Sequence, residues 1–375
     1  MQMRVVHLST AHPAKDTRIL RRECATLAAD GRFDITYLNA KGEEFSYKNV
    51  SVVSFDRPRK RVGRFLLSVP KALHAVCRRP CDVVHLHDPE LMLLVPLIRL
   101  TGRRVIFDFH ENYMEKIYSR RWIPGVLRPS ARILFGALVG TSTRCLSGVV
   151  AATPEISRVL GHRNSVVIRN LPDVHMIKPP PTGADRVKGL LLYTGGLTAN
   201  RGIVQVIDAL RGWEFEDWRL VIVGRENPII ADLVADALRD ERIEYRGEVD
   251  FGEVLKLMQR AAVGVVCNQP GYDYEMALPN KLFEYMAAGL PVVASNFPVW
   301  TDIILGSGAG LVCDPTSRTD IQRAIGQLLS DSAGRSASGM LGRELVQREF
   351  SWSEESKKLI ELYKGLFTSR GEVSR

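Results

Sequence analysis

Residues 279–295 have the sequence PNKLFEYMAAGLPVVAS, which predicts a short helix followed directly by a strand. Pro279 suits the first turn of a helix, and Gly289 suits its end. The apolar run 290–294 is typical of a strand buried inside a sheet. A helix that passes straight into a buried strand indicates α/β architecture, in which helices join parallel strands.

Two charged residues of this helix, Lys281 and Glu284, occupy unfavourable positions. Lys281 lies in the first turn, where the helix dipole disfavours a positive charge by roughly 0.3–1 kcal/mol. Glu284 shares its face with apolar neighbours, so its carboxylate needs a hydrogen-bond partner. A nucleotide sugar would supply a diphosphate for the helix end and a ribose diol for Glu284. From the residues alone, an ion pair between Lys281 and Glu284 explains the pattern equally well.

The segment 279–295 closely resembles the donor-site signature of the retaining glycosyltransferases of family 4. This resemblance implies the GT-B fold, in which two doubly wound parallel-sheet (Rossmann-like) domains face a cleft and a C-terminal helix crosses back to the first domain. It also implies that Glu284 binds the donor ribose. Backbone amides at the start of the helix, near Leu282, are expected to hold the diphosphate.

Apolar runs and helical patterns alternate along the whole chain, in two series. The predicted strands are 4–8, 34–38, 83–86, 105–109, 148–152 and 166–169, then 190–194, 220–223, 243–245, 263–267, 291–294 and 310–312. A proline-rich stretch separates the two series. We therefore expect an acceptor-binding domain over 1–172, a linker over 173–182, a nucleotide-sugar domain over 183–351 and a crossover helix over 352–375.

Ligands of doubly wound sheets bind at the carboxyl ends of the strands. In the second series this rule selects the loop 194–201, where Gly195 and Gly196 allow a phosphate to approach the backbone and Arg201 adds a cation. Members of the resembling family place a further cation at the position of Gly196. We infer that Lys281 supplies the missing positive charge.

Three further residues are predicted to bind the donor. Arg246 and Glu248 match the family position that lines the nucleobase, although an ordinary turn at a strand end explains them equally well. The family also has a second glutamate eight residues before Glu284, where this chain has Met276. A slip of one residue would let Glu275 take that role.

The same rule selects three loops of the first series, 9–16, 85–90 and 108–111. His110 matches the family position beside the reacting sugar, so we expect it to stabilise that sugar. Glu111 is expected to orient His110 or to contact the acceptor. Asp16 is a natural N-cap, and together with Arg18 it is also expected to face the acceptor.

His87 and Asp88 are expected to line the acceptor site. The spacing of His85, His87 and Asp88 would also suit a divalent metal in a metallohydrolase. No later histidine motif completes a ligand set, so no metal is expected. The resemblance implies transfer with retention, metal independence, no cofactor besides the UDP- or GDP-type donor, and no general base.

Charge is distributed unevenly. Residues 1–180 contain 29 Lys and Arg against 15 Asp and Glu, whereas the whole chain has 51 against 42. The densest basic part, from Arg57 to Arg79, flanks an apolar helical stripe, a pattern typical of contact with an anionic membrane surface. A core-facing helix with a basic edge is the alternative. Few aromatic residues accompany the charges, so a nucleic-acid partner is not expected.

No apolar stretch reaches the ~20 residues that a membrane span requires, and the chain does not begin with a signal-peptide pattern. We therefore expect a cytoplasmic hexosyltransferase, peripheral on the inner face of the membrane, that acts on a lipid-linked or glycan acceptor of a surface-polysaccharide pathway. Two alternatives stay open. One is a nucleotide-sugar epimerase on the same fold, and the other is an inactive nucleotide-sugar-binding subunit.

Overall fold

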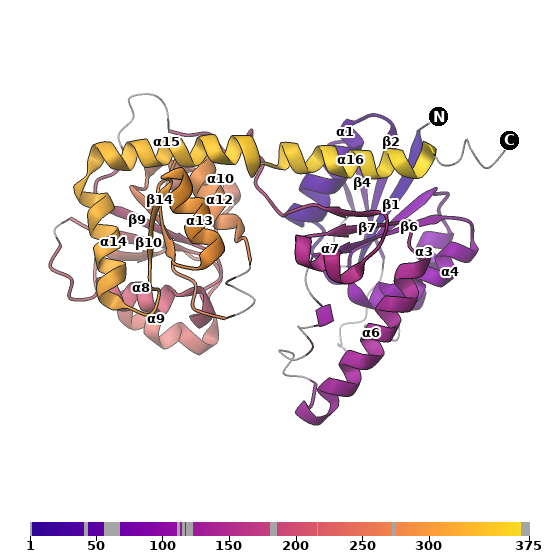
Figure 1. Cartoon of the computed structure of the whole chain (residues 1–375), viewed down its shortest axis with the longest axis horizontal. Helices are drawn as coiled ribbons and strands as arrows, with labels where there is room; N and C mark the ends of the chain where they lie inside the picture. The colour runs from indigo at the N-terminus through magenta and orange to yellow at the C-terminus, as the bar shows by residue number, and fades with distance from the viewer. Residues whose placement is uncertain are drawn as a thin grey trace. The chain divides into compact units, whose positions relative to one another are not determined.

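A computed structural model of the chain describes residues 2–40, 44–55, 68–110, 113–114, 117, 123–180, 186–215, 217–271, 275 and 277–368. The chain divides into two compact units (Figure 1). Unit 1 comprises Met1–Asn170 and Glu354–Arg375, and unit 2 comprises Leu171–Ser353.

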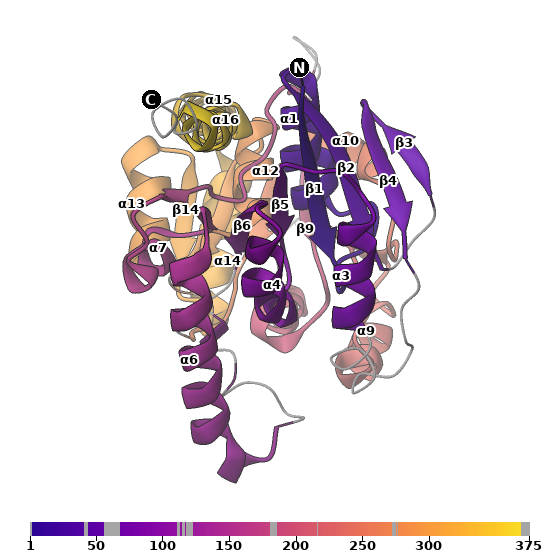
Figure 2. The ribbon, with the colours of Figure 1, turned by 90° about the vertical axis from the view of Figure 1, so that its right-hand side faces the viewer.

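Unit 1 is built on an eight-stranded sheet (Figure 2). Its strand order is β3-β4-β2-β1-β5-β6-β7-β8, and β3 alone runs antiparallel to its neighbour. The strands are β1 (Met3–Ser9), β2 (Phe33–Asn39), β3 (Phe45–Tyr47), β4 (Val50–Ser54), β5 (Val83–Leu86), β6 (Arg104–Phe109), β7 (Gly148–Ala151) and β8 (Ser165–Val167). The six strands predicted for this half are confirmed.

The edge strand β3 and its neighbour β4 were not predicted. They form a hairpin whose two turn residues, Lys48 and Asn49, have φ angles of 45° and 64°. Such turns normally contain glycine, and this one does not, so the sequence lacks the usual hairpin signal.

The helices of unit 1 are η1 (Thr17–Cys24), α1 (Ala25–Ala29), α3 (Val69–Cys77), η3 (Pro89–Leu94), α4 (Val95–Leu100), η4 (Gly125–Leu127), α6 (Arg128–Cys145), α7 (Pro154–Leu160) and α16 (Trp352–Thr368). The N-cap pattern of Asp16 predicts a helix from residue 17 onward, and η1 begins there, but η1 is a π-helix. The predicted crossover helix is confirmed, because α16 joins unit 1. Glu355 of α16 accepts hydrogen bonds from the backbone and side chain of Arg169.

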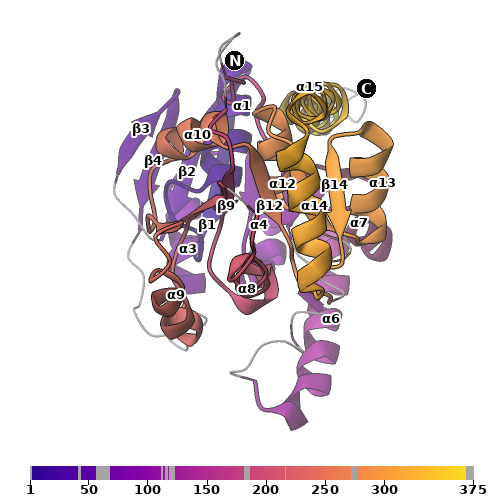
Figure 3. The same cartoon turned by 90° about the vertical axis from the view of Figure 1, so that its left-hand side faces the viewer.

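Unit 2 has a six-stranded parallel sheet of order β11-β10-β9-β12-β13-β14 (Figure 3). Its strands are β9 (Leu190–Thr194), β10 (Arg219–Val223), β11 (Ile243–Tyr245), β12 (Val263–Val266), β13 (Val292–Ser295) and β14 (Gly310–Cys313). Its helices are η5 (Ala199–Arg201), α8 (Ile203–Leu210), η6 (Pro228–Ile230), α9 (Ala231–Ala237), α10 (Phe251–Arg260), α12 (Asn280–Ala287), α13 (Pro298–Ser307), α14 (Arg318–Ser330) and α15 (Ser332–Glu349).

Both sheets are buried on both faces, as parallel sheets usually are. In unit 2 one core cluster includes Leu191 and Tyr193, and the other includes Leu190 and Leu192, so β9 alternates between the two. The strand order reverses between β1 and β5 in unit 1 and between β9 and β12 in unit 2. These switch points are where doubly wound folds bind ligands.

The basic segment from Arg57 to Arg79 is described only from residue 68 onward. There, Ala72, Ala75 and Val76 of α3 are buried, and Val69 and Leu73 pack against the same core. The apolar stripe of this part therefore faces the core of unit 1, which is the alternative to a membrane contact. Within the described ranges, no helix combines the length and the apolar character needed to cross a bilayer.

Candidate functional site

The switch point of unit 2 is occupied by the loop between β9 and α8. Gly202 has a φ angle of 72°, and a Cβ atom there would lie 1.6 Å from the carbonyl oxygen of Cys267, so only glycine fits. Gly195 has a φ angle of 123°. A Cβ on Gly195 or Gly196 would lie 3.2 or 3.4 Å from Nη1 of Arg201. The Arg201 side chain thus lies over the glycine pair, as the sequence predicted.

Lys281 lies beside this loop. Its Nζ atom is buried, has no hydrogen-bond partner among the described residues, and lies 4.2 Å from the centre of the Tyr193 ring. Burial, and then the neighbouring charge of Arg201, lower the pKa of Lys281 to about 7. The structure therefore places the two cations, Lys281 and Arg201, close to each other and to the glycine pair.

Two tyrosines that the sequence analysis missed support this loop. The hydroxyl of Tyr193 donates to the carbonyl oxygen of Gly196 at 3.3 Å. The hydroxyl of Tyr285 on α12 accepts from the backbone amide of Thr194 at 2.7 Å and donates to the carbonyl oxygen of Leu192 at 3.2 Å. Tyr285 stands next to Glu284 in the motif, and its ring is fully buried. Its place in the motif was the signal that could have identified Tyr285 as the residue that hydrogen-bonds α12 to β9.

The other residues predicted to bind the donor near α12, Glu284, Leu282 and Glu275, differ in how far they are buried and in what they contact. Glu284 is half-buried on α12, whereas the Leu282 side chain is fully buried in the core, so only its backbone can face a ligand. Oε1 of Glu275 accepts from the amide of Gly271 at 3.0 Å and closes its own loop.

Arg246 and Glu248 follow β11 and are engaged in ion pairs. Arg246 binds Glu244 at 2.7 Å and Glu253 at 3.2 Å, and Glu248 binds Arg225 at 3.0 Å. Backbone hydrogen bonds connect their turn to the glycine loop, because Gly224 donates to Gly247 and Gly195 donates to Val223. The three loops thus lie side by side at the carboxyl edge of the sheet.

In unit 1, Asp88 organises the loop after β1. Its Oδ2 accepts from Oγ of Ser9 at 2.8 Å and from the amides of Thr10 and Ala11 at 2.6 and 3.1 Å, while Oδ1 pairs with Nδ1 of His12 at 3.1 Å. Burial alone would raise the pKa of Asp88, but these hydrogen bonds and His12 lower it. Burial would likewise lower the pKa of His12, and Asp88 raises it instead. The loops 9–16 and 85–90 therefore meet, as the strand-end rule predicted.

Arg18 and Asp108 form a buried ion pair. Nε and Nη2 of Arg18 donate to the two carboxylate oxygens of Asp108, each at 2.8 Å, and Nη1 donates to the carbonyl oxygen of Ile168 at 3.1 Å. Burial alone would raise the pKa of Asp108. Arg18 and the neighbouring imidazoles outweigh burial and hold this pKa well below its usual range.

His110 and His87 both contact Asp108. The Nδ1 atom of each ring lies 3.4 Å from Oδ2 of Asp108. The other nitrogen of His110, Nε2, lies 3.0 Å from the hydroxyl of Tyr113. Of the residues predicted for the acceptor side, Arg18 and His87 thus contact Asp108, as does His110. The sequence analysis gave Asp108 itself no role.

Asp16 caps η1, since its Oδ1 accepts from the amide of Ile19 at 2.9 Å. Glu111 lies outside the described residues.

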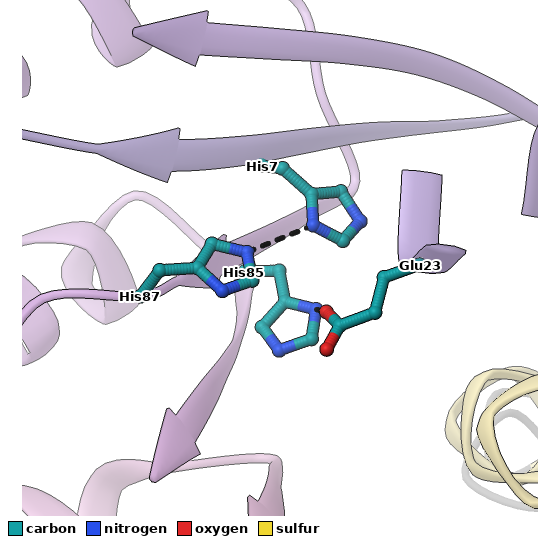
Figure 4. Close-up of side chains that lie close together, drawn as sticks. All are labelled: His7, Glu23, His85 and His87. Carbon is teal, nitrogen blue, oxygen red and sulfur yellow. Dashed lines mark hydrogen bonds and ion pairs between the residues drawn. The ribbon is translucent and has the colours of Figure 1, made fainter. Parts of the chain in front are cut away.

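A second polar cluster includes His87 itself (Figure 4). It consists of His7, Glu23, His85 and His87, all buried, each offering a ligand atom within 4.8 Å of the others. Three imidazoles and a carboxylate could hold a transition metal. The sequence analysis considered only His85, His87 and Asp88. His7 was missed because its pairing with His85, across β1 and β5, appears only in the sheet register.

Two family models match successive parts of the chain. The one described as "Glycosyl transferase 4-like domain" matches residues 13–168, and the one described as "Glycosyl transferases group 1" matches residues 188–331. The first range lies within unit 1 and the second within unit 2. The second match includes both strands of the switch point of unit 2, β9 and β12.

Among curated proteins, the chain is similar to phosphatidyl-myo-inositol mannosyltransferase of Mycobacterium leprae. The two are 26% identical over 323 residues, which cover 82% of this chain and 81% of that protein. The chain is also 25% identical over 306 residues to the glycogen synthase of Mycobacterium tuberculosis, covering 78% of this chain and 70% of that protein.

Among solved structures, the sucrose-phosphate synthase of Thermosynechococcus elongatus superimposes with a TM-score of 0.78 at 18% identity, covering 98% of this chain and 100% of the other. Anabaena HepE in complex with UDP and glucose gives a TM-score of 0.72 at 14% identity, covering 97% and 100%. At these identities the likeness concerns the fold, which all these proteins share.

Proposed function

Because the chain belongs to the GT-B glycosyltransferases of the GT4-like type, we propose that it transfers a hexose from a nucleoside-diphosphate donor to an acceptor hydroxyl with retention of configuration and without a divalent metal. The donor would bind at the switch point of unit 2. The acceptor side would be formed by the residues around Asp108 in unit 1.

The observation that carries this proposal is the pair of cations in unit 2. The ammonium of Lys281 is buried without a hydrogen-bond partner among the described residues, and the charge of Arg201 lowers its pKa further. Two close positive charges are unfavourable in the free protein, and a diphosphate would relieve the repulsion.

In the proposed reaction, the bond between the anomeric carbon and the diphosphate breaks while the acceptor oxygen bonds to the same face of the sugar. The acceptor proton passes to the departing phosphate oxygen. Arg201, Lys281 and the first amides of α12 would stabilise the developing negative charge, an effect worth several kcal/mol, on the order of 3, in comparable sites. Both ring nitrogens of His110 already have partners, which supports a role without general-base chemistry.

Donor and acceptor classes are proposed from the relatives. The mycobacterial relative is named as a phosphatidyl-myo-inositol mannosyltransferase, and the Anabaena structure contains UDP. We therefore propose a UDP- or GDP-hexose donor and a lipid-linked or glycan acceptor.

We further propose that the protein works at a membrane surface. Val126, Leu127, Ile133 and Leu134 of η4 and α6 are exposed, the last two by 72% and 71%. Residues 123–154 contain three arginines and no acidic residue. Figures 1 and 2 show α6 extending away from the sheet of unit 1. Exposed apolar side chains bordered by arginine suit an anionic bilayer.

The membrane proposal predicts that the protein cosediments with vesicles containing phosphatidylglycerol. The double variant Ile133→Asp/Leu134→Asp should lose at least tenfold in binding, because two inserted side chains become charged. Ile229→Asp, which alters an equally exposed apolar residue of unit 2, is the control. Unchanged vesicle binding of the double variant, or a change only in its oligomeric state, would refute the membrane contact.

The proposed function predicts that Lys281→Ala lowers kcat, or raises the donor KM, by tens of fold. Lys188→Ala, which removes an exposed lysine of the same unit that pairs with Asp217, should leave both parameters unchanged. Product analysis by NMR should show transfer with retention. Conversion of the nucleotide sugar without an acceptor would indicate an epimerase, and donor binding without turnover would indicate an inactive subunit.

A further inference from the structure

We infer that Tyr363 of α16 is a positioning residue: its hydroxyl begins a one-way chain of hydrogen bonds through His7 and His87 that ends on the carboxylate of Asp108. The chain links four elements, α16, β1, the end of β5 and β6. The hydrogen-bond chain itself rests on geometry alone, whereas its consequence for sugar transfer rests on the proposed function.

The direction of the chain is set by Asp108. Arg18 binds both oxygens of this buried carboxylate, so Asp108 is ionised and can only accept hydrogen bonds. Nδ1 of His87, 3.4 Å from Oδ2, must therefore carry a proton. Burial lowers the pKa of His87 more than Asp108 raises it, so the ring is neutral and its Nε2 has a lone pair.

The proton positions of His7, Tyr363 and His85 follow in turn. Nδ1 of His7 lies 2.9 Å from Nε2 of His87, the contact drawn in Figure 4, so His7 donates there. Burial, together with His87, keeps the pKa of His7 well below its usual value, so Nε2 of His7 is an acceptor. The Tyr363 hydroxyl, 3.4 Å away, donates to it. The tyrosine oxygen then accepts from Nδ1 of His85 at 2.9 Å.

The assignment also accounts for Nε2 of His85, the ring that donates to the Tyr363 hydroxyl. With its proton on Nδ1, the neutral His85 has a lone pair on Nε2, and this atom has no hydrogen-bond partner among the described residues. The reverse direction would place an unpaired N–H there and a protonated Asp108 against Arg18. An unpaired lone pair on Nε2 of His85 costs less free energy than an unpaired N–H combined with a protonated Asp108. In the second case the guanidinium of Arg18 would lose its counter-charge.

The same protons argue against a metal in this cluster. A metal held through Nδ1 of His7 and Nε2 of His87 would displace the proton that these two atoms share in the chain. Glu23 contacts the cluster from η1. Its Oε1 lies 3.1 Å from Nε of Arg18, and burial and the charge of Asp108 raise its pKa, so its neutral form suits the site without a cation.

Removal of the Tyr363 hydroxyl should weaken every hydrogen bond of the chain between His7 and Asp108. His7 would lose the donor at Nε2 and could move its proton there, which would set two lone pairs of His7 and His87 against each other. His87 would then turn its proton away from Asp108. His110 shares Oδ2 of Asp108, so its position beside the sugar would loosen.

The test is Tyr363→Phe in the full chain, followed by long-range proton–nitrogen NMR of histidine labelled with ¹⁵N. In the wild type, His7 and His87 should each be protonated on Nδ1 and bare on Nε2 across neutral pH. In the variant these signals should shift or split between tautomers. We expect kcat to fall about tenfold, equivalent to about 1.4 kcal/mol, with the donor KM changed less than twofold.

Tyr37→Phe is the matched control, because it removes another buried tyrosine hydroxyl of unit 1 that lies outside the chain. It should leave the tautomers unchanged. The inference is overturned by Nε2-protonated His7 or His87 in the wild type, by unchanged tautomers in Tyr363→Phe, or by one equivalent of metal in the purified protein. None of these results requires activity, so a wrong tautomer assignment can be told apart from a wrong proposed function.

Discussion

At the scale of single residues, Lys281 has a buried ammonium whose pKa lies well below the usual value for lysine. With a pKa of about 7, Lys281 is neutral in an appreciable fraction of the free molecules at neutral pH. A bound diphosphate would favour the charged form and raise this pKa again. Donor binding should therefore take up a proton above pH 7 and almost none at pH 6.

The sign of the pH dependence follows from that proton. Since the free protein loses the proton as the pH rises through about 7, donor affinity should fall from pH 7 to pH 9, by up to tenfold per pH unit. Calorimetry in buffers of different ionisation enthalpy measures the uptake directly. Lys281→Arg, whose guanidinium stays charged, should remove it. Equal affinity at pH 6 and pH 9 in the wild type would contradict the contact between Lys281 and the diphosphate.

Some site residues were predictable because the sequence pattern that identifies them lies within a few residues of each. Lys281 and Arg201 stand at the ends of predicted elements, where helix starts and glycine turns identify them. His7, Glu23, Tyr113 and Tyr363 carry no such signal. His7 lies in a strand whose neighbours depend on the sheet order, and Tyr363 reaches it from more than 350 residues away in the sequence.

At the scale of elements, α16 is held to unit 1 by a buried carboxylate. Glu355 is fully buried, and it binds the backbone and guanidinium of Arg169 and the ammonium of Lys358. Glu355→Gln would remove the negative charge from two cations, so we expect a loss of about 2–3 kcal/mol in the free energy of unfolding.

The neighbouring Glu354 provides the control for this prediction. It pairs with Lys357 at the same spacing, but both side chains are largely exposed. Glu354→Gln should cost less than about 0.5 kcal/mol. Urea unfolding followed by circular dichroism measures both variants. Equal losses in the two variants would mean that Glu355 does not anchor the helix.

The sequence predicted twelve of the strands because short, mainly apolar runs of three to five residues mark them. It did not predict β3 and β4, whose turn lacks glycine, or the π-helical form of η1. That form matters for the site, because Arg18 and Glu23 both lie in η1 and reach Asp108 and the histidine cluster from it. An expected α-helix gives the same residues a different angular spacing, so periodicity alone could not predict these contacts.

At the scale of the whole molecule, the two units are both built on doubly wound sheets, but the charged residues at their switch points differ. Unit 2 presents Arg201 and the buried ammonium of Lys281 at its switch point. Unit 1 places ionised Asp108 and Asp88 at its switch point and surrounds them with Arg18 and histidines. The first design suits an anionic donor. The second suits an acceptor hydroxyl and a sugar that gains positive charge.

The measurement that tests the central claim most directly is calorimetric binding of UDP, GDP, ADP and their sugars to the full chain, with Glu284→Ala and Lys281→Ala as comparison variants. We predict that one nucleotide and its sugar bind the wild type, and that each variant weakens this binding at least tenfold. Absence of binding by every nucleotide, or equal binding by wild type and variants, would contradict the donor site in unit 2 and the proposed function with it.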